Sequence, residues 1–158
     1  MILQSKELKG LMLNYLSVGY RQEIYEIISM EIDEQRVTAS VDLNNLVLHS
    51  DGQYHLSSTL ALPLLQQIAT VYTCIDNGLT SPPGGLMLLD MSLKFRKAIR
   101  EQRNVLFLMD FKNSRIARKG SGIVLYKDVK ISINDYSFHG CGSFMLTESR
   151  VHIQSRDN

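Results

Sequence analysis

Two adjacent glutamines, Gln66 and Gln67, lie in the middle of an apolar stretch that runs from Asp51 to Gly78. A side-chain amide can donate a hydrogen bond to a carbonyl oxygen and accept one from water, although a buried amide can also be an ordinary part of a core. The sequence has no Asp or Glu between Asp51 and Asp76, so the usual carboxylate base is missing here. These residues favour chemistry that polarises a carbonyl.

Two histidines, His49 and His55, flank the turn that leads into this stretch. If the stretch is a helix, the N–H groups at its start carry partial positive charge and can stabilise an oxyanion. Histidine also titrates near neutral pH. The combination predicts acyl transfer from a thioester, but histidines in a loop are often no more than solvated side chains.

Other catalytic signatures are weak. The sequence has no Gly-x-Ser-x-Gly motif and no phosphate-binding loop, and Cys74 and Cys141 lack the spacing of a disulfide framework, a redox motif or a zinc site. We therefore expect no cofactor and no metal, and interpret both cysteines as small buried apolar side chains. A reducing cytoplasm is expected, because the N-terminus lacks a signal peptide and no apolar run reaches the length of a membrane span.

Basic side chains are concentrated between Leu86 and Lys130, where acidic ones are few. Lysine and arginine at strand ends and in hairpin loops can bind the phosphates of coenzyme A or the acidic surface of an acyl carrier protein. The residues assigned to this role are Arg96, Lys97, Arg115, Arg118 and Lys119. A solvated basic face explains each of them equally well. Nucleic acid is disfavoured as a partner, since no aromatic residues alternate with these charges.

The elements that must position these side chains follow from hydrophobic periodicity. We expect a short helix, two strands, a long buried helix with Pro63 in its first turn and a stop at Gly78, and four long strands. The first helix is Leu3–Leu16, and the strands are Glu23–Asp33, Arg36–Leu43, Leu86–Ile99, Asn104–Asn113, Gly120–Asn134 and Tyr136–Glu148. Ser114–Gly120 is interpreted as a hairpin loop.

The chain has 158 residues, of which 44% are hydrophobic, and this is enough for one domain spanning 1–158 with a polar tail from about residue 150. An antiparallel sheet with one long buried helix must curl around that helix, because nothing else in the chain can cover it. We therefore predict an α+β hot-dog fold. Its open edge strands predict a homodimer or higher homo-oligomer.

Three segments together resemble the FcoT-like long-chain fatty acyl thioesterase family: LNYLSVGY, YHLSSTLALPLLQQIATVY and DMSLKFRKAI. The resemblance implies a site with a tyrosine near the N-terminal helix, a second tyrosine before the central helix, and an asparagine within that helix. Tyr15 matches the first position, and His55 keeps the family's histidine. The other two positions depart, because His49 replaces the tyrosine and Gln66 replaces the asparagine with an amide one methylene longer.

The leading hypothesis is a thioesterase acting on acyl-CoA or acyl carrier protein, in which helix N–H groups and Gln66 polarise the carbonyl while Tyr15 or His49 orients water. The acyl chain would lie beside Leu64 and Ile68, with pantetheine running toward the basic residues. Two alternatives stay open: addition to, or elimination from, an enoyl or hydroxyacyl thioester, and non-catalytic acyl-CoA binding. Ordinary dehydration is disfavoured, because the helix lacks the carboxylate it needs.

Overall fold

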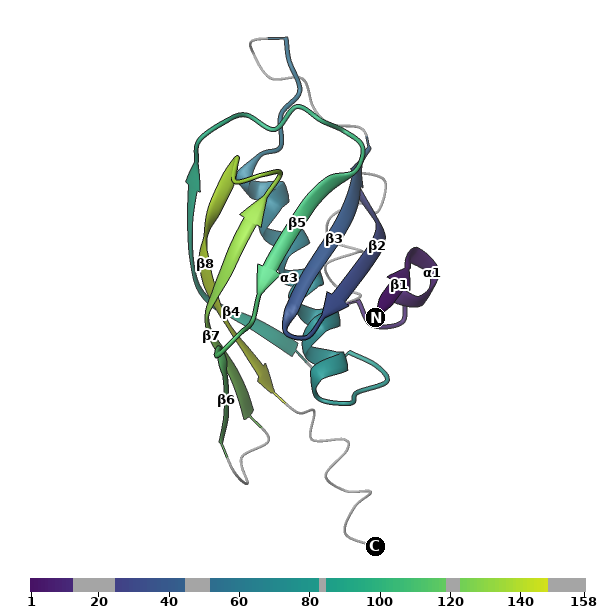
Figure 1. Ribbon diagram of the computed structural model, residues 1–158, viewed down its shortest axis with the longest axis vertical. Helices are drawn as coiled ribbons and strands as arrows, with labels where there is room; N and C mark the ends of the chain where they lie inside the picture. Colours follow the sequence, from purple (N-terminus) through teal and green to yellow (C-terminus); the bar gives the residue numbers. More distant parts are fainter. Residues whose placement is uncertain (13–24, 45–51, 83–84, 119–122, 148–158) are drawn as a thin grey trace, which may run out of the picture.

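The computed structural model describes residues 1–12, 25–44, 52–82, 85–118 and 123–147. Within them the chain forms eight strands and two helices, shown in Figure 1. In order these are β1 Ile2–Gln4, α1 Ser5–Leu8, β2 Tyr25–Asp33, β3 Arg36–Leu43, α3 Ser58–Asp76, β4 Gly85–Phe95, β5 Val105–Asp110, β6 Arg115–Arg118, β7 Ile123–Ile133 and β8 Phe138–Thr147.

The long helix α3 begins and ends on sequence signals. The Ser57 side chain caps its start by accepting a hydrogen bond from the Leu60 N–H at 3.3 Å. At its end Gly78 adopts a left-handed φ of 65°, and the Leu79 N–H donates to the Cys74 carbonyl at 2.8 Å. This is the hydrogen bond of a Schellman stop, so the predicted termination at Gly78 is confirmed.

Pro63 does not lie in the first turn of α3, as the sequence predicted, because the helix begins at Ser58 and places Pro63 in the second turn. A proline there cannot bond the carbonyl four residues earlier, which belongs to Thr59. Thr59 is exposed, and water can therefore satisfy that carbonyl.

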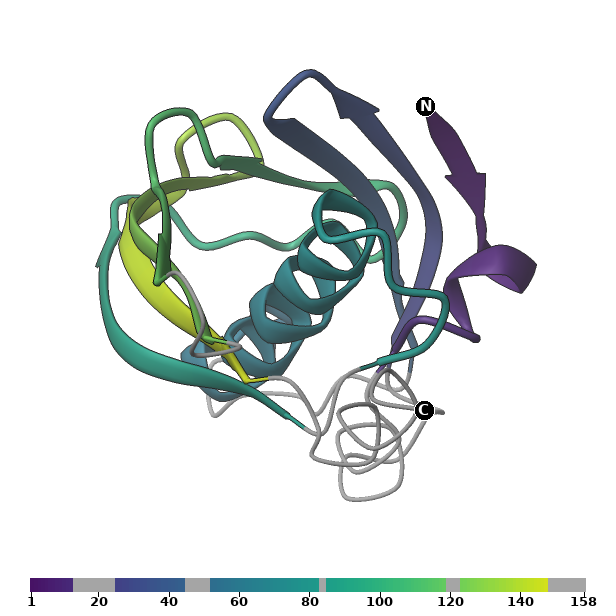
Figure 2. The same cartoon turned by 90° about the horizontal axis from the view of Figure 1, so that it is seen from below.

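The strands form one antiparallel sheet in the order β1-β2-β3-β5-β7-β8-β4, with β6 paired to β7 alongside this path. Viewed from below in Figure 2, the sheet curls around α3. β3 shows how the sequence specifies this curl: Val37, Ala39, Val41 and Leu43 are buried, and the residues between them are more exposed. The predicted α+β architecture, a long antiparallel sheet wrapped around one buried helix, is confirmed.

The core lies between α3 and the concave face of the sheet. An aromatic cluster fills its lower part, where the rings of Tyr72 and Phe111 stack with centroids 3.9 Å apart and Tyr126 meets Phe111 edge-on at 5.7 Å. α3 is itself long and apolar enough to cross a bilayer, contrary to our expectation that no run reached that length. However, 72% of its apolar 18-residue window is buried inside the protein, as in the core helix of a folded domain.

Two segments differ from the sequence prediction. The predicted helix Leu3–Leu16 is shorter, because Ile2–Gln4 forms a strand paired with β2 and the helix covers only Ser5–Leu8; residues 13–16 lie outside the described part of the chain. The predicted hairpin loop contains strand β6, whose four residues pair with Ile123–Tyr126 of β7. The polar tail from about residue 150 also lies outside the described residues.

Candidate functional site

The segment that leads into α3 is fixed at one end of the sheet. The Leu56 N–H donates to the Ile99 carbonyl at 2.8 Å, and the Leu43 N–H donates to the Gln102 carbonyl at 2.7 Å. These bonds join the lead-in, the end of β3 and the connection between β4 and β5. We call this the upper end, because it lies at the top of Figure 1, and call the end where α3 stops the lower end.

His55 lies in this lead-in, half-buried, two residues before the Ser57 cap. The structure therefore places it at the start of α3, as the sequence predicted. Tyr15, His49 and Lys119 lie outside the described residues, so their proposed roles stay predictions.

One side of α3 is left open along its first half by Thr59, Leu62 and Gln66, which we call the open strip. Thr59 and Leu62 are exposed and Gln66 is half-buried, whereas most other side chains of the helix are buried. The three residues follow helical spacing and so share one face. A ligand or a second protein chain can reach the helix from this side.

The Gln66 side chain bridges α3 to the sheet. Its amide nitrogen donates to the Leu86 carbonyl of β4 at 2.9 Å. One donor of the amide is thus used to hold the helix against an edge strand. Gln67, by contrast, is completely buried on a neighbouring face of the helix.

The sequence hypothesis assigned both the helix start and Gln66 to one thioester carbonyl. Gln66 is eight residues beyond Ser58, which corresponds to about 12 Å along the helix axis. A single carbonyl oxygen cannot accept from both groups of one protomer. Within one chain the helix start and Gln66 therefore do not act together on one carbonyl.

Leu64 and Ile68, the residues expected to line the acyl chain, have no exposed surface. Both belong to the continuous core between α3 and the sheet. An acyl chain that contacts them has to open this packing beside the helix.

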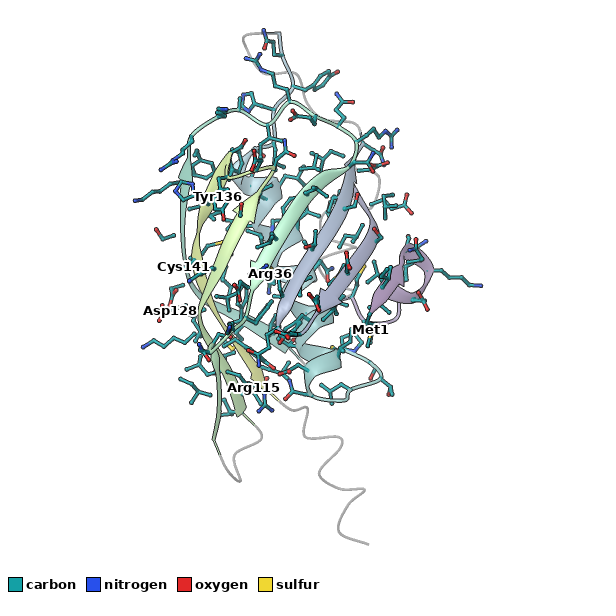
Figure 3. All side chains as sticks on the ribbon, viewed as in Figure 1. Met1, Arg36, Arg115, Asp128, Tyr136 and Cys141 are labelled. Atoms are coloured by element: carbon teal, nitrogen blue, oxygen red, sulfur yellow. The ribbon has the colours of Figure 1, made fainter. Side chains whose placement is uncertain are left out.

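The basic residues divide between the two ends of the sheet. Arg96 lies at the upper end, where its N–H donates to the Ser137 carbonyl of the β7–β8 turn at 2.8 Å, and Lys97 follows it; both are exposed. Arg115 lies at the lower end, and Figure 3 shows it far from Tyr136, the neighbour of Ser137. Arg118 ends the same strand as Arg115. One protomer therefore does not gather these cations into a single phosphate site.

Arg115 is also engaged with its own chain. Its Nε forms an ion pair with the Asp76 carboxylate at 3.0 Å, and its guanidinium donates to the Asn77 side chain at 3.0 Å. The Tyr126 hydroxyl donates to Asp76 at 2.6 Å and accepts from Asn77 at 2.7 Å. Burial and the adjacent carboxylate raise the pKa of Tyr126, so it stays a neutral donor. This closed cluster locks the end of α3 to β6 and β7.

A polar hollow of about 620 Å³ lies next to this cluster at the lower end. Its walls carry charges of both signs, contributed by Asp33, Glu34, Gln35, Arg36, Asp76, Asp110, Lys112 and Asn113. Arg36 and Asp110 pair across it at 3.5 Å. The hollow lies away from Gln66 and the lead-in, so it does not belong to the predicted site.

Tyr25, the first residue of β2, is a buried tyrosine that the sequence analysis did not single out. Its side chain is 6% exposed and its hydroxyl forms no hydrogen bond of ordinary geometry with the described residues. Gln67 lies near enough to lower the pKa of this hydroxyl, but burial has the larger effect and raises it. A tyrosine within a strand carries no sequence signal that separates such a group from ordinary core.

The cysteines are free. Cys74 is completely buried, and burial raises the pKa of its thiol to about 11. It therefore carries no thiolate at neutral pH and is no nucleophile. Cys141 is partly exposed on the outer face of β8, so the expectation that both cysteines are buried holds only for Cys74.

No protein-family model and no curated protein matches the chain. Several solved structures, in contrast, match the chain in structure. A proposed thioesterase from Shewanella oneidensis aligns over 90% of this chain and 98% of its own, with a TM-score of 0.65 and 9% identity. A hypothetical thioesterase protein with coenzyme A from Streptococcus pneumoniae aligns over 92% and 98%, with a TM-score of 0.50 and 17% identity.

A dehydratase heterocomplex from Xenorhabdus doucetiae is also similar, with a TM-score of 0.51 and 13% identity over 85% of this chain and 90% of its own. At such identities the likeness concerns the fold alone. Together with the antiparallel sheet wrapped around α3, it shows that this chain has the hot-dog fold.

Proposed function

We propose that this protein is a thioesterase that hydrolyses a fatty acyl thioester of coenzyme A or acyl carrier protein. The observation that carries the proposal is the open strip of α3, where the Gln66 amide stands on a helix that has no carboxylate before Asp76. The hot-dog neighbours named as thioesterases support this class of reaction. The sequence resemblance to FcoT-like enzymes favours long acyl chains.

In the proposed reaction the oxygen of water bonds to the thioester carbon and the carbon–sulfur bond breaks. The thiolate takes a proton, and the products are a fatty acid and a free thiol. Gln66 stabilises the developing oxyanion by donating from its amide, a contribution that in other enzymes is worth roughly 100-fold or more in rate. Tyr15 or His49 orients the water. His55, at the start of α3, contacts another part of the substrate.

The carrier is proposed on two grounds. The neighbour from Streptococcus pneumoniae has coenzyme A in its structure. In this chain, exposed Arg96 and Lys97 lie at the same end of the sheet as the start of α3. Phosphates of coenzyme A, or acidic side chains of an acyl carrier protein, would pair with these two cations.

We also propose a homodimer formed through β4. This strand has eleven residues and pairs only with β8 among the described strands, which leaves one edge open, and Met87 and Leu89 on it are about half exposed. Antiparallel pairing of two β4 edges would set the upper end of one copy beside the lower end of the other. Arg115 and Arg118 of a second copy would then lie at the same end as Arg96.

Addition or elimination chemistry is the second candidate, because one neighbour is a dehydratase. The structure disfavours it. The only carboxylate of α3 is Asp76 at its last position, where Arg115 and Tyr126 bind it. No other residue of this helix carries a carboxylate that could serve such a reaction.

The test is thiol release from acyl-CoA substrates of increasing chain length, with Gln66→Ala and Gln66→Asn compared with the wild type. We expect Gln66→Ala to lower kcat roughly 100-fold. Gln35→Ala is the matched control, because it removes an exposed amide at the lower end and should leave kcat unchanged. Tight acyl-CoA binding without any thiol release would favour the non-catalytic alternative and would contradict the proposal.

A further inference from the structure

Tyr136 stands on the turn between β7 and β8, at the upper end of the sheet, and is exposed by 63% (Figure 3). Its φ is 62°, in the left-handed region where a bulky side chain is strained and glycine is favoured. Asn134 and Asp135 have similar angles, but their side chains tolerate them well. Because the ring does not belong to the hydrophobic core, neither packing nor backbone preference explains a tyrosine here. Such strain is typical of functional positions.

The backbone of this turn is held in place from several sides. The Tyr136 N–H donates to the side chain of buried Ser132 at 3.2 Å. The Asn134 N–H donates to the Leu106 carbonyl at 2.8 Å, and its side-chain amide donates to the Glu101 carboxylate at 3.0 Å. The ring therefore starts from a fixed point, which lowers the entropy lost when a ligand binds to it.

The Tyr136 ring lies beside His139 of β8, with the two ring centroids 6.4 Å apart. His139 is directly opposite Lys94 of β4, and opposite residues of an antiparallel pair share one face of the sheet. Phe95, the next residue of β4, points to the other face, where its ring meets buried Phe138 edge-on at 4.6 Å. Lys94 and Phe95 are thus on opposite sides of the strand.

Three cations surround the turn. The Arg96 and Lys97 N–H groups both donate to the carbonyl of Ser137, the residue after Tyr136, at 2.8 and 3.3 Å. The side chains of Lys94, Arg96 and Lys97 are exposed, and none of them forms an ion pair with the residues that the structure describes. We call these three cations and Tyr136 the upper corner.

The carboxylates beside the upper corner are Glu101 and Asp135. Glu101 is engaged by its own chain, since it accepts from the Arg100 N–H at 3.1 Å as well as from Asn134. Asp135 is exposed. With Arg100 included, four cations face two carboxylates, so this end of the sheet attracts an anion.

We propose that the upper corner binds the nucleotide of coenzyme A, with the adenine ring stacked on Tyr136 and the phosphates paired with Lys94, Arg96 and Lys97. A fixed aromatic ring binds the face of a base, and free cations beside it bind phosphate. An acyl carrier protein presents its acyl chain on phosphopantetheine without adenine, so it could use the cations but not the exposed ring. The carrier is therefore coenzyme A. This choice of carrier rests on the proposed thioester function.

The experiment is calorimetric titration of the whole protein with coenzyme A, adenosine 3′,5′-bisphosphate and 4′-phosphopantetheine. We expect coenzyme A to bind at least about tenfold more tightly than 4′-phosphopantetheine, because stacking and the nucleotide phosphates add to its affinity. Tyr136→Leu should raise the Kd of coenzyme A and of the bisphosphate about tenfold and leave that of 4′-phosphopantetheine unchanged. Tyr136→Phe keeps the ring and should keep the wild-type values.

Two controls test the position of the site. Phe95→Leu removes another exposed ring at the same end, on the other face of β4, and should leave the Kd of coenzyme A unchanged. Lys94→Ala should raise this Kd roughly fivefold, as loss of a charged contact predicts, whereas Lys112→Ala, an exposed lysine at the lower end, should not change it.

Tyr136→Gly separates binding from stability. Glycine is favoured at a φ of 62°, so this variant should melt no lower than the wild type although it binds coenzyme A more weakly. A marked fall in Tm with unchanged affinity for coenzyme A would assign the ring a structural role and overturn the inference.

Equal Kd values for coenzyme A in the wild type and Tyr136→Leu would also overturn it. The same follows if an acyl carrier protein ester is hydrolysed as fast as the CoA ester and Tyr136→Leu changes neither rate; the cations then dock the carrier protein, and the thioesterase function stands. Conversely, Tyr136-dependent binding of coenzyme A without any thiol release would support the nucleotide site while the proposed function fails.

Discussion

Replacing Tyr126 with Phe is expected to lower the free energy of unfolding by about 2–3 kcal/mol. The Tyr126 ring is completely buried, and its hydroxyl donates to Asp76 at 2.6 Å and accepts from Asn77 at 2.7 Å. Phenylalanine keeps the edge contact with Phe111, whose centroid is 5.7 Å away. The substitution therefore removes the hydroxyl and little else.

The size of the stability loss depends on which interactions Asp76 and Asn77 retain without the Tyr126 hydroxyl. A hydrogen bond to a carboxylate contributes about 1.5–3 kcal/mol and a neutral one about 0.5–1.5 kcal/mol. After the substitution Asp76 still pairs with Arg115 at 3.0 Å, and the Asn77 amide still donates to the Thr73 carbonyl at 2.7 Å. Neither partner is left unpaired, so the loss stays near the lower half of the summed range.

The assay is reversible unfolding by denaturant, supported by thermal melting, where the expected loss corresponds to about 4–12 °C in Tm for a chain of this size. Tyr72→Phe is the control, because that hydroxyl forms no hydrogen bond with the described residues and its ring belongs to the same cluster. We expect Tyr72→Phe to change stability by less than about 1 kcal/mol. An equal loss in the two variants would refute the assignment of stability to the Asp76 cluster.

Three further predictions concern other parts of the molecule. In Gly140→Ala, a Cβ would overlap the Ser92 carbonyl of β4, so a denaturant titration should show a loss of about 1–3 kcal/mol or more in stability. If the variant were as stable as the wild type, β4 and β8 would not approach each other this closely. Cys141 should react with a thiol reagent in the native protein while Cys74, buried and with its pKa raised to about 11, reacts only on unfolding; two equally fast thiols would contradict this burial. Stability should fall as pH rises from about 10 to about 12. Burial, and after it the charge of nearby carboxylates, raises the pKa of Tyr72 to about 12, so over this range the unfolded chain loses a proton that the folded chain keeps. Tyr72 alone contributes a fall of at most about 1.4 kcal/mol per pH unit, and the raised pKa values of Cys74 and Tyr126 add to it; a flat profile in pH-dependent denaturation would oppose the prediction.

The parts of the fold that local patterns determine were predictable. α3 has an apolar surface, a serine cap and an Asn-Gly stop, and these signals act within a few residues of each other. The alternation in β3 likewise specifies one buried face. From a buried helix and long strands, the wrapped sheet follows because the helix has no other cover.

The errors come from pairings that sequence periodicity does not contain. Ile2–Gln4 is a strand because it adds to the edge of β2, and β6 is a strand because it adds to β7. Each has four residues or fewer, which is too short for an alternation to stand out. Partners in the folded sheet decide the conformation of both.

The separation of the basic residues could have been predicted from the directions of the strands that precede them. Strands β4 and β5 are antiparallel in the sheet path, so the connection after β4 and the one after β5 leave from opposite ends. Arg96 and Arg115 follow these two strands and therefore lie at opposite ends. The engagement of Arg115 with Asp76, in contrast, depends on where α3 stops against the sheet, which no spacing predicts.

Hydrolysis of a thioester is the central claim, and product analysis in water enriched in heavy oxygen tests it most directly. The protein is mixed with an acyl-CoA in this water, and the products are examined by mass spectrometry. We predict free coenzyme A and fatty acid in equal amounts, with one heavy oxygen from water in the carboxylate of the acid, and strong loss of both products in Gln66→Ala. Recovery of an intact thioester, or of a thioester with water added to its acyl chain, would contradict the account.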